Sequence, residues 1–229
     1  MKRGLQLLTI FVTMIFSSAY GADSAFVDAD NEIARCDKVL RDISSMPDKY
    51  VPKELFQKAR GLAIFPGVLN IGALLGIELG KGIILRRDQE TLRWSNPAFF
   101  IFRSGSIGLQ LGAQSIDLIL LFMDEIGLQR LLEEKLILGA DVSVSAGPLG
   151  RDTSVDTNLR LKSQILSYSK TKGLFAGLSI NSGVIQPDRN TNEAFYGTDV
   201  SVQDVLYENK GTQTDNIRTL LETINSITR

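Results

Sequence analysis

Apolar residues near the start of the chain recur at alternating spacings of three and four positions. The series runs through Phe26, Ala29, Ile33, Cys36, Leu40 and Ile43. This spacing places the six side chains on one face of a helix. A second, shorter helix is expected to begin at Pro52, which suits a first helical turn, and to end at Gly61.

From Leu62 onward the pattern changes to short apolar runs separated by glycines. Apolar residues alternate with small or polar ones at 107–112 and again at 142–145, which predicts antiparallel strands. The nearly continuous apolar run from Asp117 to Met123 predicts a buried central strand. Because glycines inside strands mark bulges and bends, the expected sheet is strongly curved or a partly closed barrel.

Two further helices are expected in the second half of the chain. Asp124 precedes leucines at helical spacing and is a suitable cap, with Lys135 at the end of that segment. A final helix is expected from a cap near Thr214, with one apolar side formed by Ile217, Leu220, Leu221, Ile224 and Ile227. The sequence therefore predicts a single α+β domain over residues 22–229, with N-terminal, central and C-terminal helices and a largely antiparallel sheet.

Residues 1–21 have the pattern of a secretory signal peptide. Lys2 and Arg3 form a short positive region, an apolar segment follows from Leu5 to Ile15, and small residues precede Ala22. Cleavage is expected before Ala22, with cleavage after Ala19 as the alternative. The apolar segment is shorter than the about 20 residues of a membrane-spanning helix. We therefore expect an exported protein, located in a bacterial periplasm.

Charge and composition exclude several classes of function. Removal of residues 1–21 takes away two of the 25 basic residues and none of the 26 acidic ones, leaving a net charge of −3. A protein that binds nucleic acid would normally carry a basic face. This chain is net acidic, so no nucleic acid is expected as a partner. The chain has no histidine and one cysteine, which excludes Ser-His and Cys-His pairs and a cysteine zinc cage. No cofactor and no metal are expected.

Two short motifs approach enzyme signatures without their required context. The segment from Gly76 to Gly82 has three residues between the first two glycines where a P-loop has four, so a bent strand is the better interpretation. Ser167 and Lys170 have the Ser-x-x-Lys spacing of a serine hydrolase, which needs a helix to bring both to one face. The surrounding residues have a strand pattern, which separates them. We therefore expect no enzyme.

Four polar residues form a candidate cluster, namely Asp117, Asp141, Arg151 and Asp152. Asp117 and Asp141 lie at the starts of apolar strands, where an unpaired carboxylate is unfavourable. The first interpretation is structural, with an internal Arg–carboxylate pair and aspartates that cap turns. The alternative is a cation site or a pocket for a polar headgroup.

Two groups of residues are candidates for contact with a membrane. One is the set of cations along the N-terminal region, Arg35, Lys38, Arg41, Lys49 and Lys53, beside the apolar helix stripe. The other is an arginine–aromatic segment represented by Arg86, Arg87 and Trp94, with Arg103 and Phe99 nearby. Each group has a structural alternative, because the helix stripe suits packing on the sheet and the second segment suits a strand edge.

Seven blocks of sequence, in order, carry a resemblance to a known family. They are ARGLAIFP (59–66), WSNPAFF (94–100), GLQLGAQSID (108–117), LLFM (120–123), LGAD (138–141), AGPLGRD (146–152) and AFYG (194–197). Together they resemble the SYLF domain, a family associated with membrane lipids. In eukaryotic members the resemblance implies phosphoinositide binding through an N-terminal amphipathic helix and basic residues, and some members bind actin.

The resemblance implies a non-catalytic protein that binds anionic membrane lipid through basic residues and an apolar helix face. On this hypothesis the lipid-binding residues are the two groups of cations and aromatics described above. The alternative is a protein–protein interaction module of the cell envelope, without lipid specificity. An envelope protein is then the partner in place of the lipid.

Overall fold

The computed structural model describes most of the 229-residue chain. It covers residues 2–44, 51–71, 76–106, 115–149, 163–171, 174–177, 180 and 182–228. Side chains are described over the same ranges except at 2–22, 70–71, 76–78, 106 and 174–175.

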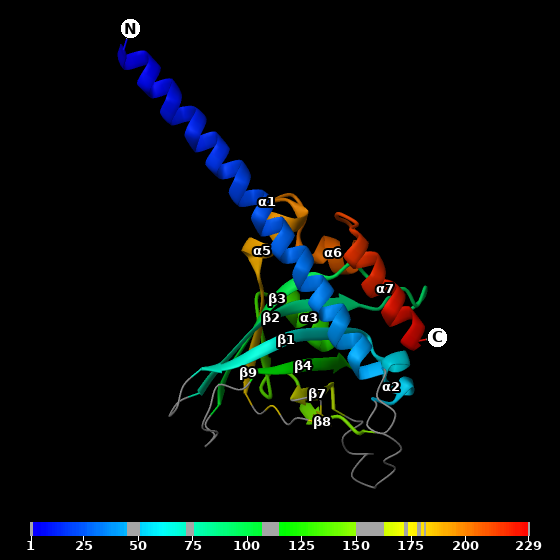
Figure 1. Cartoon of the computed structure of the whole chain (residues 1–229). Coiled ribbons are helices and arrows are strands. Elements are labelled where there is room, and N and C mark those ends of the chain that lie inside the picture. Colours follow the sequence, from blue (N-terminus) through cyan, green and yellow to red (C-terminus); the bar gives the residue numbers. More distant parts are fainter. Residues whose placement is uncertain are drawn as a thin grey trace.

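Helices within these ranges occur at the start, in the middle and at the end of the chain (Figure 1). They are α1 (Lys2–Ser44), α2 (Lys53–Lys58), α3 (Ile126–Leu132), α5 (Arg189–Tyr196), α6 (Val202–Glu208) and α7 (Asp215–Thr228). Strands lie between them as β1 (Gly61–Ile71), β2 (Gly76–Arg86), β3 (Ala98–Ser106), β4 (Ser115–Phe122), β5 (Leu136–Leu138), β6 (Val144–Ala146), β7 (Ile165–Thr171), β8 (Leu174–Gly177) and β9 (Gly183–Pro187). The α+β fold class is confirmed.

The described strands form one sheet in the order β5-β9-β3-β2-β1-β4-β7-β6, with β8 paired to β7. Their pairing is antiparallel except between β6 and β7, which are parallel. The two ends of this path, β5 and β6, follow each other in sequence and meet at a bridge between Leu138 and Val142. The sheet is therefore barrel-shaped and nearly closed, as the sequence predicted.

Curvature in the sheet has a visible cause in β1. Its register shifts between Ile64 and Leu69 against β2, and Gly67 there adopts φ 63°, a left-handed conformation that favours glycine. Asp117 of β4 accepts a hydrogen bond from the Gly67 amide at 3.0 Å. A bulge of this kind bends the strand and increases its twist. The segment Gly76–Gly82, which lacks P-loop spacing, is part of β2.

A layer of helices covers one side of the sheet, with α1 lying across it beside α7 (Figure 1). All members of the predicted apolar stripe except Phe26 are buried, and Phe26 stacks on Phe195 of α5 at 4.7 Å between ring centroids. Thr214 caps α7 by accepting from the Ile217 amide at 3.2 Å. The structure therefore uses the apolar stripe of α1 to pack the domain.

The predicted elements that fall in described residues match the structure closely. The run at 117–123 is the buried strand β4, between β1 and β7. Asp124 accepts a hydrogen bond from the Ile126 amide at the start of α3. The predicted alternation at 107–112 lies outside the described residues.

Candidate functional site

The predicted cations of α1 are paired within the helix itself. Ion pairs one helical turn apart join Arg35 to Glu32, Lys38 to Asp42 at 3.0 Å, and Arg41 to Asp37. Between Asp23 and Ser44 the helix carries six acidic and three basic residues. The helix is therefore net acidic, although Glu32 and Asp37 are buried, and its apolar face is buried as well. Lys53 is exposed at the start of α2, and Lys49 lies outside the described residues.

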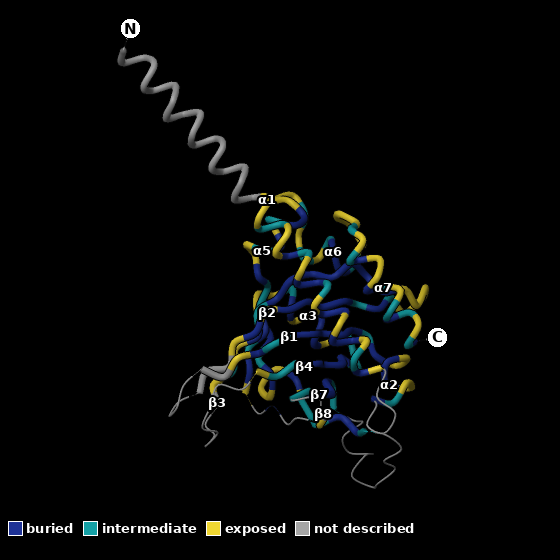
Figure 2. Tube along the Cα trace, viewed as in Figure 1, coloured by how far each residue is buried: buried dark blue, intermediate teal, exposed yellow. Residues whose placement is uncertain are grey.

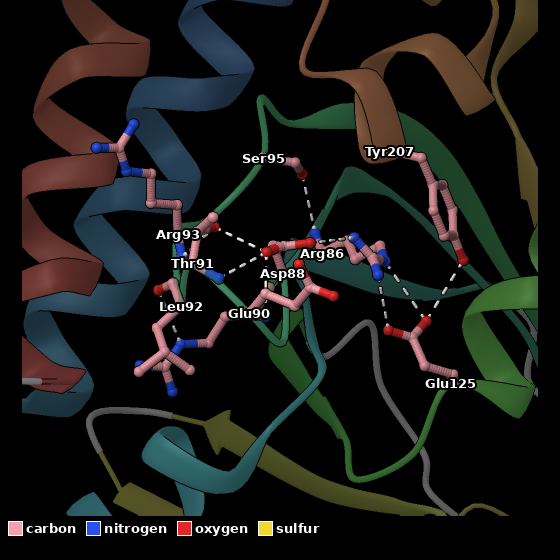
Figure 3. Close-up of polar contacts among 10 residues, drawn as sticks. Arg86, Asp88, Glu90, Thr91, Leu92, Arg93, Ser95, Glu125 and Tyr207 are labelled. Atoms are coloured by element: carbon pink, nitrogen blue, oxygen red, sulfur yellow. Dashed lines mark hydrogen bonds and ion pairs between the residues drawn. The ribbon is translucent and has the colours of Figure 1, made fainter.

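The second predicted group is internal. Arg86 forms an ion pair with Glu125 at 3.1 Å, and its guanidinium lies 4.2 Å from the ring centroid of Tyr207. Figure 3 shows Arg86, at the end of β2, directed toward Glu125 at the start of α3 and toward Tyr207 of α6. The structure uses this arginine to connect three elements.

Arg87 and Trp94 are buried next to Arg86. Arg87 donates hydrogen bonds to the carbonyl oxygens of Gln57 at 2.5 Å and Leu92 at 3.2 Å. Burial, with a contribution from nearby Arg60, lowers the pKa of Arg87. The expected cationic and aromatic surface at these positions is therefore not present, because the side chains face the interior.

The four residues of the predicted polar cluster do not form one described site. Asp117 accepts from the Gly67 amide and lies 4.0 Å from the Lys170 ammonium. Asp141 instead accepts from the Ile137 amide at 2.7 Å and holds the turn after β5. Arg151 and Asp152 lie outside the described residues. The two described carboxylates thus have separate partners. Asp117 interacts with a lysine and a backbone amide, and Asp141 interacts with a backbone amide of its own turn.

Ser167 and Lys170 lie on β7 and interact with different elements. Ser167 donates to the Ser145 carbonyl oxygen at 3.2 Å, whereas Lys170 pairs with Asp42 of α1 and with Asp117 of β4. Residues three apart on a strand point to opposite faces. The geometry of a Ser–Lys hydrolase is therefore not formed by these two side chains.

A different surface emerges from the register of the strands. Five directly paired residues form one row across β1, β2, β3, β9 and β5, in the order Leu69, Leu79, Arg103, Val184 and Ile137. Directly opposite residues share a face of the sheet, and we call this row the outer row. Leu69 and Leu79 are 49% and 40% exposed, and Arg103 is also exposed. Figure 2 shows β2 and β3 changing from buried to exposed toward their ends beyond the helices.

Neighbouring positions in the same strands point the other way and form the core. Val68, Phe102 and Ile185 alternate with members of the outer row and are almost completely buried. The helices cover the sheet farther along, where Ile83 and Leu85 of β2 are buried as well. The outer row is therefore the part of the outer surface of the sheet that the helical layer leaves uncovered.

Cations surround the outer row. Lys81 and Arg103 come from the sheet, Lys135 from the segment before β5, and Arg189 from the start of α5. A shallow groove of about 440 Å³ runs between Arg103, Lys135 and Arg189. Lys81 pairs with Asp188 at 2.9 Å and Arg189 lies 3.9 Å from Glu134. Within the described ranges neither Arg103 nor Lys135 has an ion-pair partner, so the surface keeps net positive charge.

Sequence reasoning named Arg103 but not the surface to which it belongs. Leu69, Leu79 and Arg103 are far apart in the chain, and the signal that unites them is strand register. The local signal that could have shown Arg103 to face outward was the alternation within β3, where Phe102 is buried and Arg103 is exposed.

The described residues offer little support for metal chemistry or for a membrane-spanning helix. In these ranges no three histidine, cysteine or acidic side chains are arranged to hold a metal ion. A search of the same part of the chain finds no helix of the length and hydrophobicity needed to cross a bilayer.

The described residues form an α+β fold, a barrel-shaped sheet with a helical cover and a row of exposed leucines and cations on its outer face. Residues 103–227 match the family model described as Ysc84, Las17-binding protein actin regulator. The chain belongs to this Ysc84, or SYLF, family, which confirms the resemblance seen in the sequence blocks.

Similar proteins come from animals and yeast. The SH3 domain-containing YSC84-like protein 1 of Bos taurus is 31% identical over 77% of this chain and 53% of its own length. Protein YSC84 of Saccharomyces cerevisiae is 33% identical over 69% of this chain and 34% of its own length. LAS seventeen-binding protein 3 of the same species is 32% identical over 69% of this chain and 35% of its own length. The chain thus spans about half the length of the animal protein and a third of the yeast ones.

Proposed function

We propose that this chain is a non-catalytic docking protein that binds anionic membrane lipid through the outer face of its sheet. The observation that carries the proposal is the outer row, in which exposed Leu79 pairs with Arg103 on one side and with exposed Leu69 on the other. Apolar side chains can enter the headgroup region while neighbouring cations contact anionic headgroups. The surface therefore combines the two interactions that peripheral membrane binding needs.

The charge around the row supports attraction to anionic lipid. Arg103, Lys135 and Arg189 line the groove with two acids, Glu134 and Asp188. Lys81 adds a fourth cation through its ion pair with Asp188. Each cation near an anionic bilayer contributes about 1 kcal/mol, and the attraction decays within a Debye length of about 8 Å at physiological salt. Binding by this surface should therefore rise with anionic lipid content and fall with salt.

Helix α1 is less suited than the sheet to be the membrane-binding element. Its apolar stripe is buried against the sheet and α7, so insertion would require the helix to leave the domain. Its basic residues are paired with acids of the same helix. Anionic membranes prefer a net basic polar face, whereas residues 23–44 of this helix include six acidic and three basic residues.

The test is co-sedimentation of the full chain with vesicles of graded anionic content, at low and high salt. The sheet variant Arg103→Glu/Lys135→Glu reverses two charges at the groove and is expected to lower vesicle affinity at least about ten-fold. The helix variant Lys38→Glu/Lys53→Glu makes the same change in net charge on α1 and α2. It is expected to retain affinity close to that of the unchanged chain.

The outcomes separate the two surfaces. Loss of binding in the sheet variant alone supports the proposal. Loss in the helix variant alone would return the site to the N-terminal cations named from the sequence. Failure of the unchanged chain to bind any vesicle would overturn lipid binding.

A protein partner is the second candidate, and the names of the relatives favour it. The family description mentions Las17 binding and actin regulation, and one yeast relative is named for Las17 binding. The outer row with its cations would suit an acidic protein surface as well. Binding of purified Las17 or actin filaments that the sheet variant weakens, without binding to vesicles, would establish this function instead.

We further propose that residues 1–21 direct export and that the domain works in the cell envelope. The signal-like pattern of these residues supports export. Over residues 23–44, where the side chains of α1 are described, the first one buried in the core is Ala29. The domain could therefore keep its described core after removal of the segment.

A further inference from the structure

A cavity of about 360 Å³ lies under α1, where the helix crosses β2, β3 and the start of α5. Side chains one turn apart on α1, including Asp28, Glu32 and Arg35, form one wall. Lys81 of β2 and Asp188 before α5 form the opposite side. Its volume lies in the range of small-molecule sites, about 300–1,000 Å³.

Glu32 is the unusual member of this lining. Its side chain is only 6% exposed, and one carboxylate oxygen pairs with Arg35. The other oxygen, Oε1, is buried and has no hydrogen-bond partner among the described residues. A buried carboxylate oxygen without a donor is unfavourable. The cavity is therefore lined by a side chain with an unsatisfied acceptor, and a ligand whose N–H donor reached Oε1 would satisfy it.

The remaining charges define the sign of that ligand. Asp188 is already satisfied, because its carboxylate pairs with Lys81 at 2.9 Å and accepts from the Thr191 amide at 3.2 Å. Burial opposes the charged form of Asp188, but these hydrogen bonds outweigh it and lower its pKa. Both lining cations are thus engaged by lining carboxylates, which leaves Asp28 and Glu32 Oε1 to attract a positive group.

The walls restrict the rest of the ligand. Ala25, Ala29 and Ala194 contribute small apolar side chains, and Phe99 lies among them. A short aliphatic chain suits this surface, and a compact ammonium suits the two acceptors. A metal ion is a poorer match, since calcium takes six to eight oxygen ligands and the described residues provide no such group.

We propose that this cavity binds a primary ammonium group carried on a short aliphatic chain, with Glu32 and Asp28 as its acceptors. Two sources share this chemistry, a free amine and the ethanolamine headgroup of a lipid. The proposal is independent of the outer row, because the acceptors lie on α1 and a free amine requires no membrane.

The test is calorimetric titration of the full chain with ethanolamine and with 1,4-diaminobutane. Saturable binding that Glu32→Gln weakens by about ten-fold or more is the expected result. Asp28→Asn, at an exposed position, should weaken binding several-fold without a risk to folding. Arg35→Gln should strengthen binding, because it removes a competitor for the Glu32 carboxylate. A purely structural Glu32–Arg35 pair predicts no such gain.

A control variant and two kinds of vesicle test which group and which source of amine are bound. Glu54→Gln makes the same chemical change on α2 and should leave amine affinity unchanged. Vesicles containing phosphatidylethanolamine, compared with phosphatidylcholine alone, distinguish the headgroup from the free amine. Absence of saturable binding by the unchanged chain to either amine and to ethanolamine vesicles would overturn the proposal. Equal binding by Glu32→Gln, Asp28→Asn and the unchanged chain would overturn the assigned acceptors.

Discussion

At the residue scale, Gly82 in β2 shows how closely the strands approach one another. A Cβ atom at this position would lie 2.0 Å from the Ile64 carbonyl oxygen and 2.7 Å from the Phe65 ring. Backbone cannot move aside as a flexible side chain can, so Gly82→Ala is expected to lower the free energy of unfolding by about 3 kcal/mol. Urea unfolding measures the change.

Gly105 in β3 is the matched control for that substitution. No atom lies within 4 Å of a Cβ built there. Gly105→Ala is expected to change stability by less than about 0.5 kcal/mol. Equal losses at both positions would show that chain flexibility, and not the contact with Ile64, makes glycine necessary at position 82.

The residues of the candidate sites show what local sequence can reveal. Arginine beside an aromatic residue is compatible with an exposed surface and with the interior. Arg86 is internal because Glu125 and Tyr207, from two other elements, converge on its guanidinium. That convergence is a property of the fold and leaves no mark in the segment around Arg86. The same holds for Leu69 and Leu79, which become one surface only through strand register.

At the scale of elements, Lys170 of β7 holds the end of α1 to the sheet. Its ammonium pairs with Asp42 of α1 and approaches Asp117 of β4. The hydrogen bond from Lys170, helped by Lys38 and opposed by partial burial, lowers the pKa of Asp42 below its usual 3.8. A lowered folded-state pKa means that Asp42 stabilises the fold above the unfolded pKa. This contribution is lost as the pH falls through the folded pKa.

Asp42→Asn should therefore lower stability near neutral pH, by about 1 kcal/mol for a partly exposed pair. The difference from the unchanged chain should shrink below about pH 4, where the native carboxylate also becomes protonated. Urea unfolding across this pH range measures it. Asp215→Asn is the control, because Asp215 is 89% exposed and pairs only within its own helix, with Arg218. A difference that stays constant with pH would contradict the role assigned to Asp42.

Helices α1, α2, α3 and α7 were predictable because their signal is local, whereas α5 and α6 were not predicted. The stripe from Ala29 to Ile43 and the apolar side of α7 each lie in one short window. The first is buried as expected, and on α7 Ile217, Leu220 and Ile224 are buried while Leu221 and Ile227 are partly buried. Strands β1 and β2 were foreseen only as a glycine-rich region. Their pairing depends on the bulge around Gly67, and it joins residues that no window of sequence contains together.

At the scale of the whole molecule, the expected cleavage before Ala22 can be tested directly. The chain produced in a bacterial host is expected to accumulate in the periplasm with Ala22 as its first residue. Fractionation, N-terminal sequencing and intact mass measure this. Gly21→Leu places a large residue where signal peptidase needs a small one, so cleavage there should stop or shift to follow Ala19. A periplasmic product that retains residues 1–21 would contradict the prediction.

The contact between the first and last helices has a consequence for when the domain can form. Thr214, at the cap of α7, donates a hydrogen bond to Asp30 of α1 across 184 positions of sequence, at 2.6 Å. The sheet likewise joins β3 to β9. Contacts this distant in sequence form slowly, because long loops must close first. A chain still emerging from the ribosome lacks the helix that covers α1, so the core closes only after synthesis of the final turns.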